Sequence, residues 1–203
     1  MPLRSIFGFI GIFLFGALPS RSLAMTVRPP SFPELVEEAA TIVQTRVAGV
    51  ESRAIVAPDG QRVIKTFVRF ATVKSVKGQT GEEFTLSFLG GTAEGETWHI
   101  AGMPAFRAGD EDFLFITKKA TLCPLVGAMH GRYRVQSDIA SGRRYIARDN
   151  GESLSDVANV IAPMESSSAN RATATAVAPL TPEQFEQAVR AEVAHPSRSA
   201  TPR

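Results

Sequence analysis

Alternation of apolar and polar side chains between Ile64 and Val76 constrains the fold more than any other feature of this chain. Ile64, Val68 and Phe70 fall on one face of an extended chain, whereas Lys65 falls on the other. A helix would place these apolar residues on different sides, so the period of two predicts a half-buried β-strand.

Shorter apolar runs with the same character recur along the chain and are separated by turn residues. The expected strands lie at residues 43–47, 84–88, 113–116, 122–126, 133–135 and 145–146. The expected turns lie at Pro58-Asp59-Gly60, Lys77-Gly78, Gly90-Gly91, Gly109-Asp110 and Ser141-Gly142. Many short strands with almost no helix between them predict a mainly β domain over residues 25–150, a small OB-like antiparallel β-barrel. The glycine pair predicts a tight turn or a close backbone approach.

Helix signals occur only at the two ends of the mature chain. Ser31, followed by Pro33 and Glu34, has the pattern of a capping box and predicts a short helix over residues 32–40. Thr181, with Gln184 three residues later, predicts a C-terminal amphipathic helix.

The composition changes between the expected barrel and this last helix. Residues 164–179 are small and polar, without an apolar period, so we expect a flexible linker over residues 151–180. Residues 181–203 then hold the C-terminal helix and a disordered tail.

Residues 1–24 have the pattern of a secretory signal peptide. Arg4 precedes an uncharged apolar run from Ile6 to Leu18, and small residues follow up to Ala24. A bilayer-spanning helix needs about 20 apolar residues, so this run is short for a permanent anchor, and an uncleaved anchor is the alternative. We expect cleavage near Ala24, export to the periplasm or the medium, and no stable membrane anchor after processing.

Charge and cysteine usage exclude two classes of protein for the mature chain. The full chain has 22 basic and 20 acidic residues, and loss of Arg4 and Arg21 with the leader makes the two numbers equal. A balanced charge argues against a nucleic-acid partner. Cys123 is the single cysteine, so no disulfide forms within the chain, and its apolar surroundings predict a buried thiol.

Several short motifs between residues 34 and 135 resemble a family of uncharacterised exported bacterial proteins. The motifs are ELVEEAATIVQTRVAGV, Val76-Lys77-Gly78, Gly90-Gly91, the run 102–106, and Gly109-Asp110-Glu111 before Phe113-Leu114-Phe115. A more distant similarity, to netrin-like and tissue-inhibitor domains, implies a five-stranded OB-type barrel. Inhibitors of that group bind a protease zinc through an N-terminal cysteine, whereas Met25 is the expected N-terminus here, so the resemblance does not carry the inhibitory residues.

Candidate catalytic and metal-binding residues are few. His99 and His130 are weak candidates for metal ligands, but they lack the short-spaced partners that zinc sites usually have, so we expect no bound metal and no cofactor. Asp110-Glu111-Asp112 is an acidic run in which successive strand residues face opposite ways. The three carboxylates therefore cannot converge, and we interpret the run as a solvated turn.

Four side chains are candidates for a binding surface: Trp98, Phe67, Arg143 and Arg144. Phe67 lies opposite the core face of its strand, and the two arginines form a basic patch with Arg148 near Tyr133 and Tyr145. We therefore predict a non-enzymatic binding or interaction module with an unknown protein partner outside the cytoplasm. The alternatives are a small metal-dependent hydrolase using His99 and His130, and an inhibitor of an exported protease.

Overall fold

The protein is mainly β, with eight strands in antiparallel sheets and a helix near each end of the part described. The computed structural model describes residues 28–119, 122–162, 164 and 177–197. The helices are α1 (Phe32–Glu38) and α2 (Pro182–Ala194), and the 3₁₀ helices are η1 (Ala128–Gly131) and η2 (Val157–Ile161). The strands are β1 (Ala39–Val56), β2 (Arg62–Lys77), β3 (Glu83–Leu89), β4 (Gly91–Ala93), β5 (Glu96–Trp98), β6 (Glu111–Thr117), β7 (Arg132–Ser137) and β8 (Arg144–Arg148). The expected leader, residues 1–24, lies outside the described residues.

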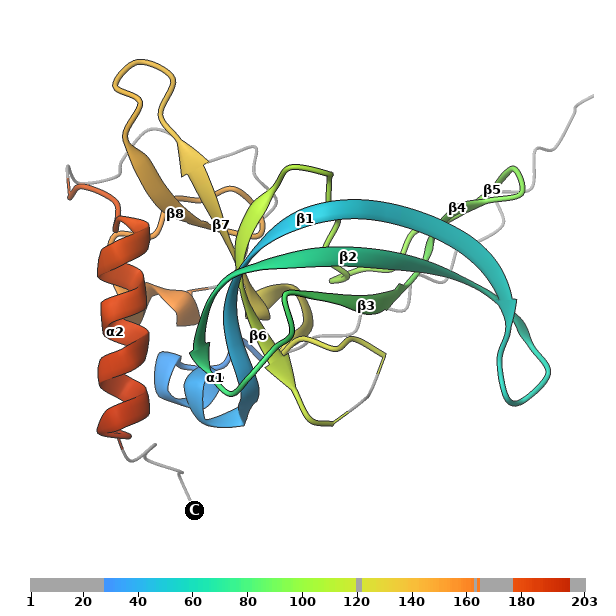
Figure 1. Cartoon of the computed structure of the whole chain (residues 1–203), viewed down its shortest axis with the longest axis horizontal. Helices are drawn as coiled ribbons and strands as arrows, with labels where there is room; N and C mark the ends of the chain where they lie inside the picture. The colour runs from blue at the N-terminus through green and yellow to red at the C-terminus, as the bar shows by residue number, and fades with distance from the viewer. Residues whose placement is uncertain (1–27, 120–121, 163, 165–176, 198–203) are drawn as a thin grey trace, which may run out of the picture.

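Six strands form one antiparallel sheet in the order β3-β2-β1-β6-β7-β8, and β4 pairs with β5 in a separate hairpin. The long central strand β1 pairs with both β2 and β6, and register shifts interrupt both pairings. Such irregularities bend a strand and increase its twist, and Figure 1 shows β1 and β2 as strongly curved ribbons. In the described part of the chain, β3 and β8 are the two edges of an open sheet. The mainly β prediction is therefore confirmed, whereas closure into an OB-like barrel is not.

The face of the sheet next to the helices carries an aromatic core. Phe185 of α2 is fully buried, with ring centroids of Phe113 at 5.3 Å, Tyr133 at 5.0 Å and Phe32 at 6.2 Å. Figure 1 shows α1 and α2 at the same end of the molecule, where they contact each other. The C-terminal helix is thus part of the main core.

The opposite face carries a second core that joins the two halves of the sheet. Phe70 and Phe88, from the β2–β3 half, have ring centroids 5.3 Å and 4.9 Å from that of Phe106, which lies just before β6. Leu114 and Leu125 complete this cluster, together with the buried Cys123, as expected for that thiol.

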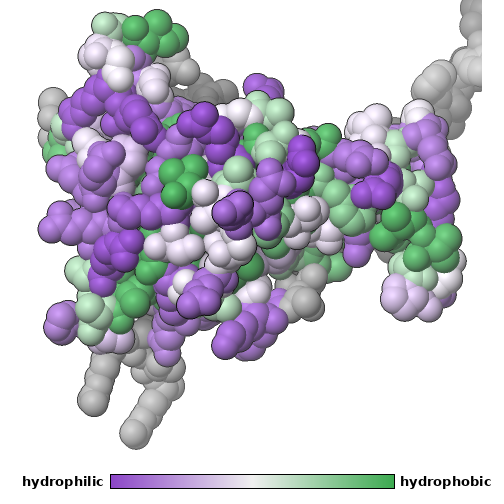
Figure 2. All heavy atoms as spheres, viewed as in Figure 1, coloured by the Kyte–Doolittle hydropathy of each residue, from purple (hydrophilic) through white to green (hydrophobic). Residues whose placement is uncertain are grey.

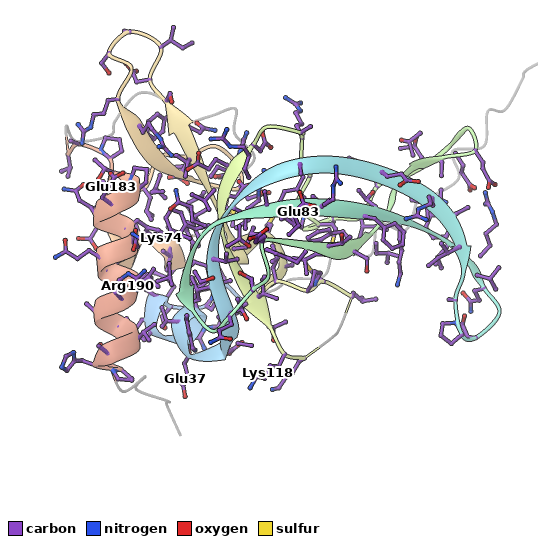
Figure 3. The ribbon with its side chains drawn as sticks, in the orientation of Figure 1. Glu37, Lys74, Glu83, Lys118, Glu183 and Arg190 are labelled. Atoms are coloured by element: carbon purple, nitrogen blue, oxygen red, sulfur yellow. The ribbon has the colours of Figure 1, made fainter. Side chains whose placement is uncertain are left out.

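Both helices begin as the sequence predicts. Ser31 with Glu34, and Thr181 with Gln184, each form a complete capping box. An ion-pair network then joins α2 to β2, because Glu186 accepts from Lys74 Nζ at 2.7 Å and from Arg190 Nε at 2.7 Å. Figure 3 shows Lys74 of β2 beside α2, close to Arg190 of that helix.

The glycine pair makes the predicted close backbone approach. Gly90 and Gly91 have φ angles of 94° and 122°, and the Gly90 N–H donates to the Ile64 carbonyl at 2.8 Å. A Cβ on Gly91 would lie 2.2 Å from Thr66 Oγ1, so a side chain does not fit there.

Two segments differ from the sequence predictions. Residues 122–126 contribute only the isolated bridge Ile116↔Leu125 and two backbone hydrogen bonds beside the end of β6, because Pro124 has no N–H with which to extend the pairing. Within the expected linker 151–180, Leu154 and Val160 are buried in the aromatic core, so the packed chain continues to residue 162. Most of the low-complexity stretch, residues 165–176, lies outside the described residues.

Exposed apolar residues include two at the extremities of the molecule. Figure 2 shows hydrophobic atoms at the tip of the β7–β8 hairpin and at the tip of the β1–β2 hairpin. Ile139 and Val56 are the exposed apolar residues of these two turn regions. Neither α1 nor α2 is long and apolar enough to cross a bilayer, and the same holds for every helix in the described part of the chain.

Candidate functional site

A buried arginine surrounded by aspartates lies where β6, β7 and β8 meet. Asp112 of β6 is opposite Arg134 of β7, and Arg132 is two residues before Arg134. Because side chains alternate along a strand, Asp112, Arg132 and Arg134 share one face of the sheet. Local strand geometry therefore brings these charges together.

Every nitrogen of the Arg132 guanidinium donates at least one hydrogen bond. Its Nε donates to Asp112 Oδ1 at 2.9 Å, and Nη2 donates to Asp110 Oδ2 at 2.9 Å. Its Nη1 donates to Asp149 Oδ1 at 3.1 Å and to the Ala105 carbonyl. The guanidinium carbon also lies 4.1 Å from the Phe106 ring centroid, which adds a cation–π contact. We name Arg132 with Asp110, Asp112 and Asp149 the arginine cluster.

Burial controls the proton affinity of this cluster. Asp112 is fully buried, and loss of hydration raises the pKa of its carboxyl to about 6, even though the Arg132 charge acts in the opposite direction. Burial also raises the pKa of Asp149 above its ordinary value. Burial alone would lower the pKa of Arg132, but the carboxylates, Asp112 foremost, raise it, so the arginine stays charged.

An open groove of about 260 Å³ lies beside the arginine cluster, where the start of β6 separates from β7. We name it the strand-end groove. It is lined by Gly109, Asp110, Glu111, Arg134, Val135, Ser137 and Arg144. Asp110 belongs to both the cluster and the groove, so the cluster fixes one side of the groove.

Glu111 organises the other side. Its Oε1 accepts from Gln44 Nε2 at 2.7 Å and from Arg144 Nη2, and its Oε2 accepts from Arg46 Nη2 at 3.4 Å. Glu111 points away from the face that Arg132 occupies, which confirms that the three carboxylates of residues 110–112 do not converge. The interpretation of this run as a solvated turn is wrong, because Asp112 is fully buried against Arg132.

The predicted binding residues do not form one surface. Arg144 lies in the strand-end groove, whereas Arg143 lines a smaller pocket of about 200 Å³ with Tyr145 and donates to the Pro179 carbonyl at 3.0 Å. Trp98 ends β5 and donates to Glu96 Oε1 at 3.1 Å. Figure 1 shows β5 and the β7–β8 hairpin at opposite ends of the long axis. Phe67 is half-buried on β2, with the Arg53 guanidinium 4.5 Å from its ring centroid.

The two candidate metal ligands lie in different environments. His99 is exposed directly after β5, whereas His130 is buried in η1. Burial, and secondarily the Arg148 charge, lower the pKa of His130, and its Nδ1 bonds to no atom among the described residues. Within those residues, no three histidine, cysteine or acidic side chains gather closely enough to hold a metal ion.

The arginine cluster was missed because its members are far apart in the sequence. A signal was present, since Asp110 and Asp112 have a spacing of two where one strand begins, and Arg132 and Arg134 have the same spacing on another. Opposite charges with a spacing of two on adjacent strands pair across a sheet, but the register that aligns them is a tertiary property.

No protein-family model matches the chain, and no curated protein matches it.

Proposed function

We propose that this protein is a non-enzymatic binding module that works outside the cytoplasm and holds a protein partner at the strand-end groove. The observation that carries the proposal is an open, charged groove whose two sides are held in place by the arginine cluster and by Glu111. Side chains that are already fixed lose little conformational freedom when a partner binds, and this improves affinity.

The size and polarity of the groove support a small group of a partner as its occupant. At about 260 Å³ the groove is smaller than most ligand sites, which hold roughly 300–1,000 Å³, and its side chains are mostly charged. A single side chain or chain end of a protein partner suits this volume better than a large apolar ligand does.

The proposal also includes export of the protein and an OB-like fold. Export would follow from the leader at residues 1–24, and an N-terminus at Met25 on the secreted protein, read by mass spectrometry, tests it. An OB-like barrel is supported by the order of strands about β1 and by the fact that OB-folds are often partly open. Membership of the family of exported bacterial proteins that the sequence resembles is part of the same proposal.

Site-specific crosslinking tests the binding function. A photoreactive amino acid replaces Ser137, which is exposed in the groove, and in a matched control it replaces Thr85, which is exposed on β3. The protein is produced in the cells that encode it, illuminated, and recovered from outside the cytoplasm. We expect a discrete adduct with another protein from position 137 and none from position 85.

The outcomes separate the candidate functions. No adduct from position 137, or the same adduct from both positions, contradicts the groove as a binding site. If the adduct contains a protease, and binding lowers the activity of that protease, then the groove is the binding site and the protein is a protease inhibitor.

A further inference from the structure

We propose that the strand-end groove binds one carboxylate group of a peptide, held by the Arg134 guanidinium in a groove that Arg144 also lines. This inference rests on the binding function proposed above and specifies the chemistry of its ligand. It concerns a single negatively charged group, either the C-terminal carboxylate of the partner or an acidic side chain.

The two acidic residues in the groove already have partners. Asp110 accepts from Arg132 Nη2 at 2.9 Å and from the Arg107 backbone N–H at 3.1 Å. Glu111 accepts from Gln44 and from two arginines. The negative charge that lines the groove is therefore already compensated, and a cationic ligand would find few open acceptors.

Arg134 is the charged groove residue whose hydrogen-bonding capacity is unused among the described residues. Its side chain is half-buried, and with the residues that the structure describes it makes no hydrogen bond or ion pair. It acts on Asp112 and Asp149 only through its longer-range charge. A guanidinium has five N–H donors arranged as a planar fork, which fits a carboxylate in two parallel bonds.

The backbone N–H of Ser137, at the end of β7, is a second donor at the groove. Ile146 of β8 uses its N–H and carbonyl away from β7, in bonds to Leu180 and Leu154. Its partner Val135 therefore directs its own polar groups toward β6, and so does Ser137, two residues later. Because β6 begins at Glu111, opposite Val135, no β6 residue faces Ser137.

The local charge balance favours a carboxylate over a doubly charged phosphate. Four arginines and four carboxylates surround the groove and its cluster: Arg46, Arg132, Arg134, Arg144, Asp110, Glu111, Asp112 and Asp149. One bound carboxylate adds a single negative charge, which Arg134 can neutralise directly. A dianion would leave a second negative charge next to Asp110 and Glu111, where repulsion weakens binding.

A titration followed by nuclear magnetic resonance tests the proposal. The full chain is expressed, the isotope-labelled protein is purified, and its amide chemical shifts are recorded while short peptides are added. One probe is a hexapeptide of glycine and serine with a free C-terminal carboxylate, the second is the same peptide amidated, and the third is the amidated peptide with one glutamate. We expect saturable shifts at Glu111 and Ser137 with the carboxylate-bearing probes and none with the amidated one. Comparison of the first and third probes then distinguishes a chain end from an acidic side chain.

Two variants fix the assignment of the binding group. Arg134→Ala removes a charged hydrogen-bond partner of the peptide, so it should lower the affinity for the carboxylate-bearing peptides by about tenfold or more. Arg69→Ala, a matched loss of an exposed arginine on β2, should leave the affinity unchanged. Equal shifts with amidated and free peptides, or unchanged affinity in Arg134→Ala, overturn the carboxylate proposal.

The crosslink from position 137 separates this result from failure of the binding function. If the protein forms the adduct, loses it in Arg134→Ala, and yet binds none of the carboxylate-bearing peptides, the result supports the binding function. The same result overturns the proposal that the ligand is a carboxylate. The absence of any adduct overturns the function itself.

Discussion

Replacement of Arg132 by methionine tests how the arginine cluster contributes to the fold. Methionine has a similar length and fills similar space, but it has no donor and no charge. The change leaves Asp112, which is fully buried, without the two guanidinium bonds of 2.9 and 3.2 Å that it accepts. Asp110 and Asp149 keep exposed side-chain fractions of 21% and 17%, so water can partly replace their lost bonds.

The expected cost follows from this contrast. Removal of one partner from a buried ion pair typically lowers the free energy of unfolding by about 3–5 kcal/mol, and most of that loss should come from Asp112. With an m-value of about 1–3 kcal/mol/M in urea, the unfolding midpoint should fall by more than about 1 M. The loss should be smaller in mild acid, because Asp112, with a pKa of about 6, is then mostly protonated in the folded protein.

Urea unfolding followed by far-ultraviolet circular dichroism, at about pH 7.5 and about pH 5, measures both effects. Arg143→Met is the matched control, because Arg143 is exposed on the β7–β8 turn, and it should change the stability by less than about 0.5 kcal/mol. A loss below about 1 kcal/mol for Arg132→Met near neutral pH would refute the reasoning. An equal loss at both pH values would refute the role given to Asp112.

Three further predictions concern Asp112, the aromatic core and the glycine turn. The folded-state pKa of Asp112 is about 6 against 3.8 for the free group, so between these two values the folded protein binds a proton that the unfolded chain does not. Its contribution to the unfolding free energy should therefore rise by roughly 2 kcal/mol as the pH falls from about 7 to about 4. Proton uptake measured between folded and unfolded protein checks this, and the uptake should shrink in Asp112→Asn. Phe185→Ala should lower the unfolding free energy by about 3–5 kcal/mol, whereas Gln187→Ala, exposed on the same helix, should change it by less than about 0.5 kcal/mol; equal urea midpoints would show that α2 does not complete the core. Gly91→Ala should lower the melting temperature more than Gly60→Ala does, because both glycines have positive φ but only Gly91 would meet other atoms within 3 Å; equal shifts would contradict the close approach.

Local interactions explain why some elements were predictable. The capping boxes at Ser31 and Thr181 use residues three apart, and the conformation of Gly90-Gly91 depends on the absence of a side chain. The period of two from Ile64 likewise specifies an extended strand, because that pattern fits one buried face. For the capping boxes and the strand period, the deciding contacts lie within a few residues or on one face of one element. For the glycine pair the sequence shows only that the backbone is free to adopt positive φ, and the close contacts come from Ile64 and Thr66.

Long-range packing decided the elements that were wrong or incomplete. Residues 122–126 have the composition of a strand, but they form one bridge and two backbone hydrogen bonds with the end of β6, because Pro124 cannot donate to a strand partner. Leu154 and Val160 stand in a polar region with little apolar period, and they are buried because the aromatic core has a place for them. Among the candidate binding residues, Arg144 reaches the strand-end groove, while Trp98 belongs to β5, which lies at the opposite end of the molecule from the β7–β8 hairpin.

The sequence by itself determined that this chain forms antiparallel strands, that helices begin at residues 32 and 182, and that no disulfide within the chain stabilises the fold. Only the tertiary structure decided the strand order, the open sheet, and the position of Arg132 among three aspartates. The physical reason is that strand periodicity and helix caps depend on neighbouring residues, whereas the register between β6 and β7 depends on which pairing buries the most apolar surface and compensates the most charge.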